Sequence, residues 1–301
     1  TFLDSNTSIR EYFKLLKKIF NEQKIDIVHA HTPHVGFLLI VFSLFHRNDI
    51  PKLFSIHYSF KHIRLRNKLA ILPIFLFFDK IIFCSESSKN SFPKWILYFT
   101  RKKSRIIYNG VDLKLINRKN IRRHLSGFSI VTASRLDKNK NINSIIKAIH
   151  KLKNEDIKLK ILGNGPELNS LKKLSSNLQL DSKITFYGQV NREKVYELLQ
   201  NAQLFISMSK TEGHPVAVLE ALGAGKPVIL SNIEPHIEID LNPDCVKIVN
   251  ELDLVNAINF YRFKSNEELS KISESSKKII KENFSLKKMT DDYLDAYERL
   301  L

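Results

Sequence analysis

The stretch LFISMSKTEGHPVAVLEALGAGKPVILS, residues 204–231, decides the fold of this chain. An apolar run, residues 204–208, leads into a polar loop, a second apolar segment follows Pro215, and Gly225 and Pro227 separate it from another apolar run. Proline fits the first turn of a helix because it has no N–H to leave unpaired, and glycine fits the position after a helix because it tolerates a positive φ. The stretch therefore predicts a strand, a loop, a helix, a turn and a strand in succession.

Two carboxylates flank the start of this predicted helix. Glu212 lies in the loop before it, and Glu220 lies within it among apolar residues. The exposed N–H groups at a helix start attract phosphate, so the two carboxylates are free to accept hydroxyl groups on either side of a phosphate. A nucleotide-diphosphate sugar has this order of groups: ribose hydroxyls, phosphates and sugar hydroxyls. The alternative is a buried helix with two incidental glutamates, but a buried charge such as Glu220 needs a partner.

Strands and helices alternate along the chain on both sides of residues 113–126, a polar and basic segment that we expect to be a linker. This alternation predicts parallel, doubly wound sheets in an α/β fold, one before the linker and one after it. Two helical runs, residues 266–281 and 286–300, finish the chain. The expected strands are residues 25–30, 52–56, 80–84, 105–108, 129–133, 159–162, 184–187, 204–208, 228–230 and 246–249.

The opening stretch resembles the donor-site signature of retaining glycosyltransferases of family 4, which have the GT-B fold. The resemblance rests on Glu212 and Glu220, on Gly213, and on the run Glu-Ala-Leu-Gly-Ala-Gly-Lys-Pro-Val that begins at Glu220. It implies two Rossmann-like doubly wound domains that face each other across a cleft. We expect an N-terminal acceptor-side domain over residues 1–120, a donor-binding domain over 121–284, and a C-terminal helix, 285–301, that packs back on the N-terminal domain.

The N-terminal domain is short by comparison with the family. Its Asp-Ile-Val-His-Ala-His strand begins after about 24 residues, whereas the family usually places a strand and a glycine-rich loop well upstream. We therefore expect this domain to be incomplete and the chain to be truncated at its N-terminus. A non-catalytic remnant that only binds nucleotide sugar is the alternative function on this view.

Further motifs extend the resemblance over most of the chain. Arg135, in Ala-Ser-Arg-Leu, and Lys140 match the residues that hold the donor diphosphate in the family. An Arg fork and a compact Lys charge can together neutralise a departing nucleotide diphosphate, whereas two incidental surface cations would be unfavourable near a helix start. The resemblance implies that Glu212 accepts hydroxyls of the donor sugar and Glu220 those of the ribose. The implied donor-binding residues are Gly163, Gly165, Tyr187, Gly213, His214, Pro215, Val216 and Glu220.

Three histidines of the first half of the chain lie in or next to expected strands. His57 follows an expected strand and matches the family's cleft histidine near the transferred sugar, which implies a catalytic role, although a histidine at a strand end is more often structural. His29 and His31 lie on one face of their strand, and we expect them to be structural or supporting residues because no third metal ligand is identifiable. The sequence lacks a D-x-D pair, so we expect catalysis without a metal or other cofactor, with a UDP- or GDP-linked donor.

The net charge of +17 is concentrated in the first part of the chain. Residues 1–125 contain 23 Lys and Arg against 8 Asp and Glu, a charge of +15, and residues 126–301 contain 25 against 23, a charge of +2. This asymmetry favours contact with an anionic membrane surface, although solvated lysine-rich faces with no specific role are common. The basic clusters are Lys14, Lys17 and Lys18, and Lys61, Arg64, Arg66 and Lys68.

Composition is that of a globular protein, with 43% hydrophobic and 26% charged residues. Cys84 and Cys245 lie in apolar runs with no disulfide or metal spacing, which fits a reducing cytoplasm and buried thiols. No run reaches the roughly 18 apolar residues of a membrane span, so residues 69–78 are expected to form a core helix or an interfacial contact.

We therefore expect a hexosyltransferase-type enzyme that uses a saccharide or lipid-linked acceptor in cell-envelope polysaccharide or lipopolysaccharide biosynthesis. Its expected location is the cytoplasm, with peripheral association at the inner face of the plasma membrane. A basic nucleic-acid-binding module is disfavoured, because the aromatic and glycine pattern of an RNA-binding sheet is missing from the sequence.

Overall fold

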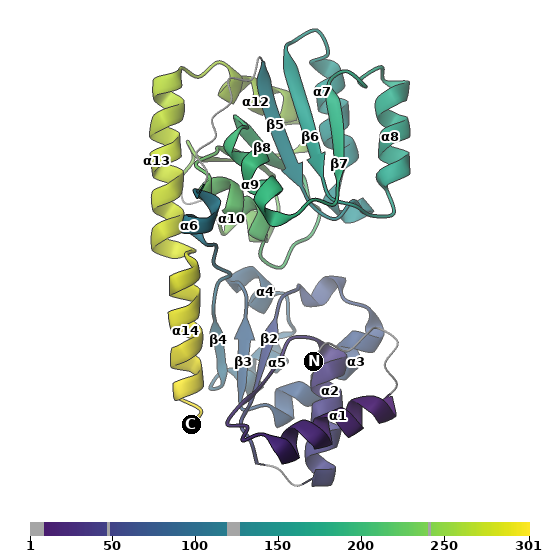
Figure 1. The fold of residues 1–301 in the computed structure, drawn as a ribbon, viewed down its shortest axis with the longest axis vertical. Coiled ribbons are helices and arrows are strands. Elements are labelled where there is room, and N and C mark those ends of the chain that lie inside the picture. Colours follow the sequence, from purple (N-terminus) through teal and green to yellow (C-terminus); the bar gives the residue numbers. More distant parts are fainter. Residues whose placement is uncertain (1–8, 47–48, 119–126, 240–241) are drawn as a thin grey trace. The chain divides into compact units, whose positions relative to one another are not determined.

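The computed structural model describes residues 9–46, 49–118, 127–239 and 242–301 (Figure 1). The chain divides into two compact units. The first comprises Thr1–Ile107 with Asp291–Leu301, and the second comprises Tyr108–Thr290. The division falls after Ile107, earlier than residue 120, and the last residues of the chain belong to the first unit.

The first unit is built on a four-stranded parallel sheet in the order β1-β2-β3-β4. Each crossover between neighbouring strands contains helix, and right-handed crossovers in one direction place these helices on one face of the sheet. The strands are β1 (Val28–Ala30), β2 (Lys52–Ile56), β3 (Lys80–Phe83) and β4 (Ser104–Ile106), and the crossover elements are α2 (Pro33–His46), η1 (Phe60–His62), α3 (Leu65–Phe77), α4 (Glu86–Asn90) and α5 (Lys94–Thr100).

The two faces of this sheet are covered differently. Phe54 and Ile56 of β2 are fully buried in a core that includes Ile71 and Ile74 of α3. Ser55, which points to the opposite face, is within hydrogen-bond distance of the Tyr293 hydroxyl, at 3.0 Å, on α14 (Leu286–Glu298). The sheet therefore lies between a layer of crossover helices and the end of α14.

Two other contacts complete the first unit. Helix α1 (Ile9–Glu22) packs against α2 through the rings of Phe13 and Phe20, whose centroids lie 5.9 and 5.1 Å from that of Phe42. Arg105 of β4 forms ion pairs with Asp292, at 2.8 Å, and with Asp295 of α14. The acidic end of the chain is thus paired with a cation of the basic first part.

The second unit has a six-stranded parallel sheet in the order β10-β9-β8-β5-β6-β7. The chain builds outward from β5 to β7 and then returns to the other side of β5, so the strand order reverses between β5 and β8. The strands are β5 (Phe128–Ala133), β6 (Ile157–Leu162), β7 (Ile184–Gly188), β8 (Leu204–Ser207), β9 (Val228–Ser231) and β10 (Val246–Val249).

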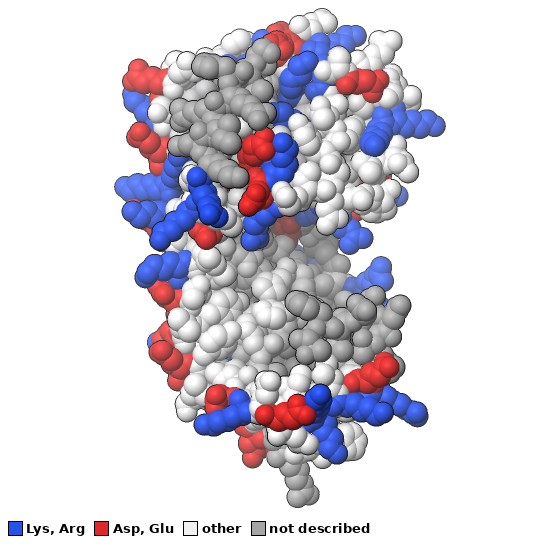
Figure 2. Space-filling view, in the orientation of Figure 1, with Lys and Arg blue, Asp and Glu red and all other residues white. Residues whose placement is uncertain are grey.

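Helices cover both faces of the second sheet, as expected of a doubly wound unit. They are α6 (Leu113–Ile116), η2 (Lys138–Lys140), α7 (Ile142–Lys151), α8 (Leu168–Asn177), α9 (Arg192–Gln200), α10 (Val216–Gly223), α11 (Glu234–Ile237), η3 (Glu251–Asp253), α12 (Leu254–Arg262) and α13 (Asn266–Asn283). On the face shown in Figure 2, Lys and Arg are interspersed with Asp and Glu over this unit.

The predicted fold class is confirmed: both sheets are parallel, and every expected strand is present with boundaries that differ by a few residues at most. Part of the expected linker, residues 113–116, forms α6, and its residues 119–126 lie outside the described ranges. Cys84 and Cys245 are buried and free, as expected. Among the helices that the structure describes, none is long and apolar enough to cross a membrane. The incompleteness of the N-terminal domain stays a prediction.

Candidate functional site

The reversal of strand order brings two loops together at one edge of the second sheet. Strands β5 and β8 pair in parallel, with Val131 opposite Phe205, so the segments that follow them leave the sheet side by side. The two loops are joined by a hydrogen bond from the backbone N–H of Lys210 to the carbonyl of Asn139, at 2.7 Å. In open parallel sheets, this switch point at the carboxyl ends of the strands is where ligands bind.

Lys140 and Glu212 meet at this switch point. Lys140 Nζ lies 2.6 Å from Glu212 Oε1, and the Ser209 hydroxyl donates a hydrogen bond to the same oxygen at 2.7 Å. The two charged side chains are only 20% and 15% exposed, so water screens their attraction weakly. The structure thus brings two of the predicted catalytic residues into direct contact and adds Ser209, which the sequence did not single out.

Helix α10 begins directly after the Glu212 loop. Pro215 is the residue before the first helical residue, Val216, whereas the sequence predicted proline within the first turn. The carbonyl of Pro215 accepts a hydrogen bond from the N–H of Val218 at 3.0 Å, so the first turn of the helix is hydrogen-bonded. Gly213, His214 and the partly exposed Val216 lie at this end of the helix, which favours negative charge.

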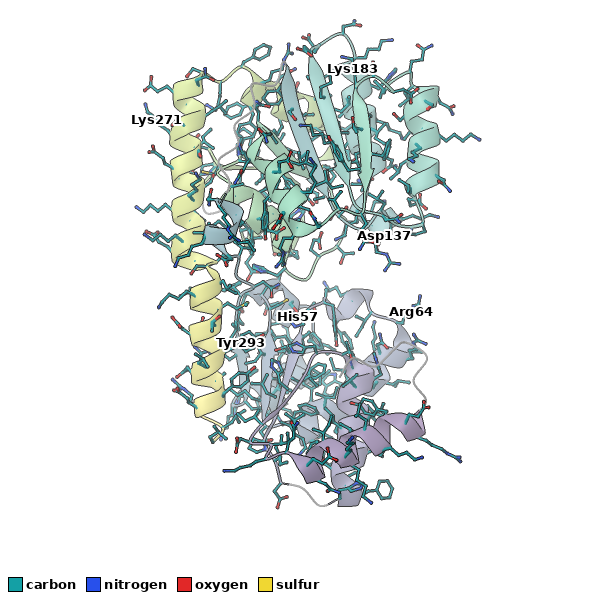
Figure 3. All side chains as sticks on the ribbon, in the orientation of Figure 1. His57, Arg64, Asp137, Lys183, Lys271 and Tyr293 are labelled. Carbon is teal, nitrogen blue, oxygen red and sulfur yellow. The ribbon has the colours of Figure 1, made fainter. Side chains whose placement is uncertain are left out.

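Arg135 and Gly163 line one cavity of about 310 Å³ at the carboxyl ends of β5, β6 and β7. Gln189 and Val190 complete its far side. Arg135 is 74% exposed and has a long ion-pair contact, 3.9 Å, with Asp137 at the edge of the unit (Figure 3). Its guanidinium can therefore reach a ligand in this cavity without breaking a buried contact.

Glycines let the turn after β6 pack against the loop after β5. Gly163 has a φ of +119°, and a Cβ built on it would lie 1.9 Å from the carbonyl oxygen of Ser134. A Cβ on Gly165 would lie 2.3 Å from the carbonyl oxygen of Leu136. At both positions the two loops are in backbone contact, and any larger residue would push them apart.

Glu220 has the partners that a buried carboxylate requires. The Tyr196 hydroxyl donates a hydrogen bond to Oε1 at 3.0 Å, and Arg192 Nε lies 3.8 Å from the same oxygen. Burial raises the pKa of Glu220, while the bond from Tyr196 and the charge of Arg192 act in the opposite direction. Both partners come from α9, a helix that the sequence predicted without assigning it a role. Tyr196 also lines a cavity of about 420 Å³ between α6 and α9.

Two predicted donor-binding residues are packed as aromatic side chains. Tyr187 is partly buried against the core of the second unit, and the neighbouring Arg135 cavity is lined by Gln189 and Val190 instead. His214 is 6% exposed, between the rings of Tyr108 and Phe284 at 5.4 and 5.5 Å. Burial lowers the pKa of His214 to about 4, so this imidazole is neutral at pH 7.

His57 lies in the first unit, at the end of β2 (Figure 3), in a chain of polar side chains. His57 Nε2 is 3.0 Å from His31 Nδ1, and His29 contacts Ser55, at 2.8 Å, and the Tyr297 hydroxyl, at 2.7 Å. Desolvation, with smaller contributions from the charges of His31 and His57, lowers the pKa of His29 to about 3. Within the described ranges, no group of three or more His, Cys, Asp or Glu is arranged to hold a metal ion.

Comparison with known families accounts for both units. A family model described as "Glycosyl transferases group 1" matches residues 115–278, and one described as "Glycosyltransferase Family 4" matches residues 2–115. The chain belongs to glycosyltransferase family 4. The site at the switch point of the second unit therefore lies in the part of this glycosyltransferase that matches the group 1 model, and His57 lies in the part that matches the family 4 model.

Relatives of this glycosyltransferase include the "O-antigen biosynthesis glycosyltransferase WclY" of Escherichia coli. It is 26% identical over a match that covers 92% of this chain and 80% of the length of WclY. The Escherichia coli "UDP-Gal:alpha-D-GlcNAc-diphosphoundecaprenol alpha-1,3-galactosyltransferase" is 26% identical over 96% of this chain and 78% of its own. Among solved structures, Anabaena HepE in complex with UDP shares the fold, with a TM-score of 0.80 and 18% identity over 95% of this chain and 81% of its own. The fold is GT-B.

Proposed function

We propose that this glycosyltransferase moves a sugar from a nucleotide-diphosphate donor to a saccharide or lipid-linked acceptor, with retention of anomeric configuration. The observation that carries the proposal is the contact between Lys140 and Glu212 at the switch point, beside the start of α10 and the Arg135 cavity. The names of the galactosyltransferase relative, with its UDP-Gal donor and lipid-linked acceptor, and of the HepE complex with UDP support it.

Arg135 and Lys140 bind the donor diphosphate in this proposal. The bond between the anomeric carbon and the phosphate oxygen breaks, and the nucleotide diphosphate leaves with the electron pair. Because Arg135, Lys140 and the helix start supply positive charge where negative charge develops, they stabilise the transition state. We propose that these groups make a metal ion unnecessary, so a chelator such as EDTA should leave the rate unchanged.

The acceptor hydroxyl attacks the anomeric carbon from the side of the leaving group, and its proton passes to the departing phosphate oxygen. Retention then needs no covalent intermediate with the enzyme. Glu212 accepts hydroxyls of the donor sugar and orients it, and His57 of the first unit serves the acceptor side. Most of the rate comes from positioning and from phosphate stabilisation.

Glu220 binds the ribose hydroxyls. Its Oε1 is held by Tyr196, and Oε2 accepts no hydrogen bond from the residues that the structure describes. A carboxylate held at one oxygen presents the other in a fixed direction, which suits recognition of a diol. Hexose transfer in the cytoplasm, with an acceptor from envelope polysaccharide or lipopolysaccharide synthesis, is the setting that we propose, since WclY is an O-antigen enzyme by name.

A thermal-shift experiment with UDP, GDP and their hexose conjugates tests donor binding. The matching nucleotide should raise the Tm of the wild type by mass action, raise it less in Glu220→Ala, and raise it fully in Glu274→Ala, an exposed control on α13. Equal rises in Tm in all three proteins would contradict the proposed contact between Glu220 and the ribose. Release of nucleotide diphosphate in the presence of acceptor tests transfer, and binding without release would identify a non-catalytic remnant.

A further inference from the structure

Helix α3 is apolar on two opposite sides. Its inner side, which includes Ile71 and Ile74, is buried in the core of the first unit. Leu65, Leu69 and Leu76 follow at spacings of four and seven residues, so they share one side of the helix, and all three are exposed. The core needs only the inner side, so the outer leucines have no packing role in the described structure of this unit.

Helix α5 repeats this arrangement. Ile96 and Thr100 are buried, whereas Trp95, Tyr98 and Phe99, at spacings of three and four residues, are exposed. Together with the outer leucines of α3 they form what we term the α3–α5 surface. Its six side chains are between 58% and 74% exposed: Leu65, Leu69, Leu76, Trp95, Tyr98 and Phe99.

The two helices are neighbours in one layer. Phe75 of α3 and Phe92, just before α5, have ring centroids 5.6 Å apart, and Lys103, just after α5, donates to the carbonyls of Leu76 and Phe78 at 3.3 and 2.8 Å. Both helices cross over the same face of the sheet, so their outer sides point away from that face together. The six apolar side chains therefore belong to one side of the unit.

The charged side chains of the two helical segments themselves are all positive, and Asp79, which interacts with Lys103, follows the first of them. Residues 60–78 and 91–104 contain no Asp or Glu. Arg64 lies at the start of α3, on the periphery of the unit (Figure 3), and the Arg101 guanidinium lies 4.5 Å from the ring of Tyr98. The cations of these two segments are Lys61, Arg64, Arg66, Lys68, Lys94, Arg101, Lys102 and Lys103.

We infer that the α3–α5 surface docks on an anionic lipid bilayer. Leucine and phenylalanine side chains enter the boundary of the acyl chains, tryptophan and tyrosine sit at the level of the headgroups, and Lys and Arg bind anionic headgroups. A second copy of this chain is a poorer occupant, because a two-fold contact would place the same cations opposite one another. The inference does not depend on the transfer reaction. It places the first unit, which carries the α3–α5 surface, at the membrane.

Trp95 offers a direct test because it is the single tryptophan of the chain. Its emission should shift to shorter wavelength, and be quenched by brominated acyl chains, when vesicles of phosphatidylcholine with phosphatidylglycerol are added. Vesicles of phosphatidylcholine alone should give a much smaller change. Cosedimentation with anionic vesicles without a Trp95 shift would show that another surface binds, and would overturn the proposal. A shift that grows with protein concentration in the absence of vesicles would overturn it in favour of self-association.

Matched variants separate this surface from general stickiness. Leu69→Ser with Phe99→Ser should weaken anionic-vesicle binding about tenfold or more, because two large apolar side chains no longer leave water. Leu252→Ser with Phe263→Ser, which are 85% and 75% exposed in the second unit, should not. Circular dichroism verifies folding of both variants. Unchanged thermal shifts with the donor nucleotide distinguish a docking defect from failure of the donor site, and equal vesicle binding by both variants would contradict the inference.

Discussion

The ammonium of Lys140 lies 2.6 Å from a carboxylate oxygen of Glu212, although the two residues are 72 positions apart. The pair joins the loop after β5 to the loop after β8, where the strand order of the second sheet reverses. Because both side chains are mostly buried, removing one leaves the other without its oppositely charged partner.

Glu212→Gln and Lys140→Met should each lower kcat about 100-fold or more, since each removes a group that orients or stabilises the reacting donor. Each should also lower the free energy of unfolding by about 1–3 kcal/mol, and the double variant should cost less than the sum of the two. Rates of nucleotide-diphosphate release and urea denaturation measure the two effects. Lys194→Met, in an i,i+3 pair on α9, is the control, with an expected stability change within about 0.5 kcal/mol. Additive stability losses would show that the pair is not coupled.

Gly163→Ala should be far more damaging than Gly188→Ala. Both glycines have positive φ, +119° and +65°, so both substitutions carry backbone strain of about 1 kcal/mol or more. Only at Gly163 would the new Cβ collide with backbone, the carbonyl oxygen of Ser134 at 1.9 Å, whereas a Cβ on Gly188 meets nothing within 4 Å. We expect Gly163→Ala to lower the free energy of unfolding several-fold more than Gly188→Ala does. We also expect Gly163→Ala to abolish the rise in Tm that the donor nucleotide causes. Similar Tm values for the two variants would mean that the close loop contact is not needed.

Tyr196→Phe should weaken donor binding with a small effect on the fold. It removes the hydroxyl that holds Glu220 Oε1, so KM for the donor should rise several-fold while kcat changes less. Tyr261→Phe is a matched control, because it removes a hydroxyl that donates to the carbonyl of Asp244 away from the site. Each should cost about 1 kcal/mol of stability. A normal KM in Tyr196→Phe would indicate that Glu220 is placed by other contacts.

The first unit should lose stability in acid through His29. Its pKa is about 3 in the folded chain, against an ordinary value of 6.5, so the unfolded chain binds the proton first as the pH falls. The resulting contribution to stability is complete above pH 6.5 and is lost as the pH falls toward 3, with a slope of at most about 1.4 kcal/mol per pH unit. His29→Gln should flatten this slope between pH 7 and 4.5, as followed by Trp95 emission in urea. An equal slope in the wild type and in His29→Gln would contradict this prediction.

Local patterns predicted much of this molecule. Alternation of apolar strands with helical segments predicted two parallel sheets, because parallel neighbours require a crossover of this kind. The loop containing Glu212 and the strand end containing Arg135 both lie at one edge of the second sheet. Short α11 escaped prediction because four residues show no helical period.

Contacts between distant segments were harder to predict. Tyr196 reads as one more core residue of an amphipathic helix, and nothing in its own segment reveals that its hydroxyl reaches Glu220. The tight packing of Gly163 against Ser134 likewise depends on how the two loops leave the sheet. Pairing of this kind follows from strand order and register, which a single sequence does not determine.

The return of α14 to the first unit has a consequence for biosynthesis. Tyr293 contacts Ser55 and Tyr297 contacts His29, across 238 and 268 residues. The strands that carry Ser55 and His29 leave the ribosome early, but the tyrosines that cover them follow only after roughly 15–50 s of translation at ordinary bacterial or eukaryotic rates. The first unit to be synthesised is therefore the last to be finished, and the nascent chain must carry one uncovered sheet face through the folding of the whole second unit.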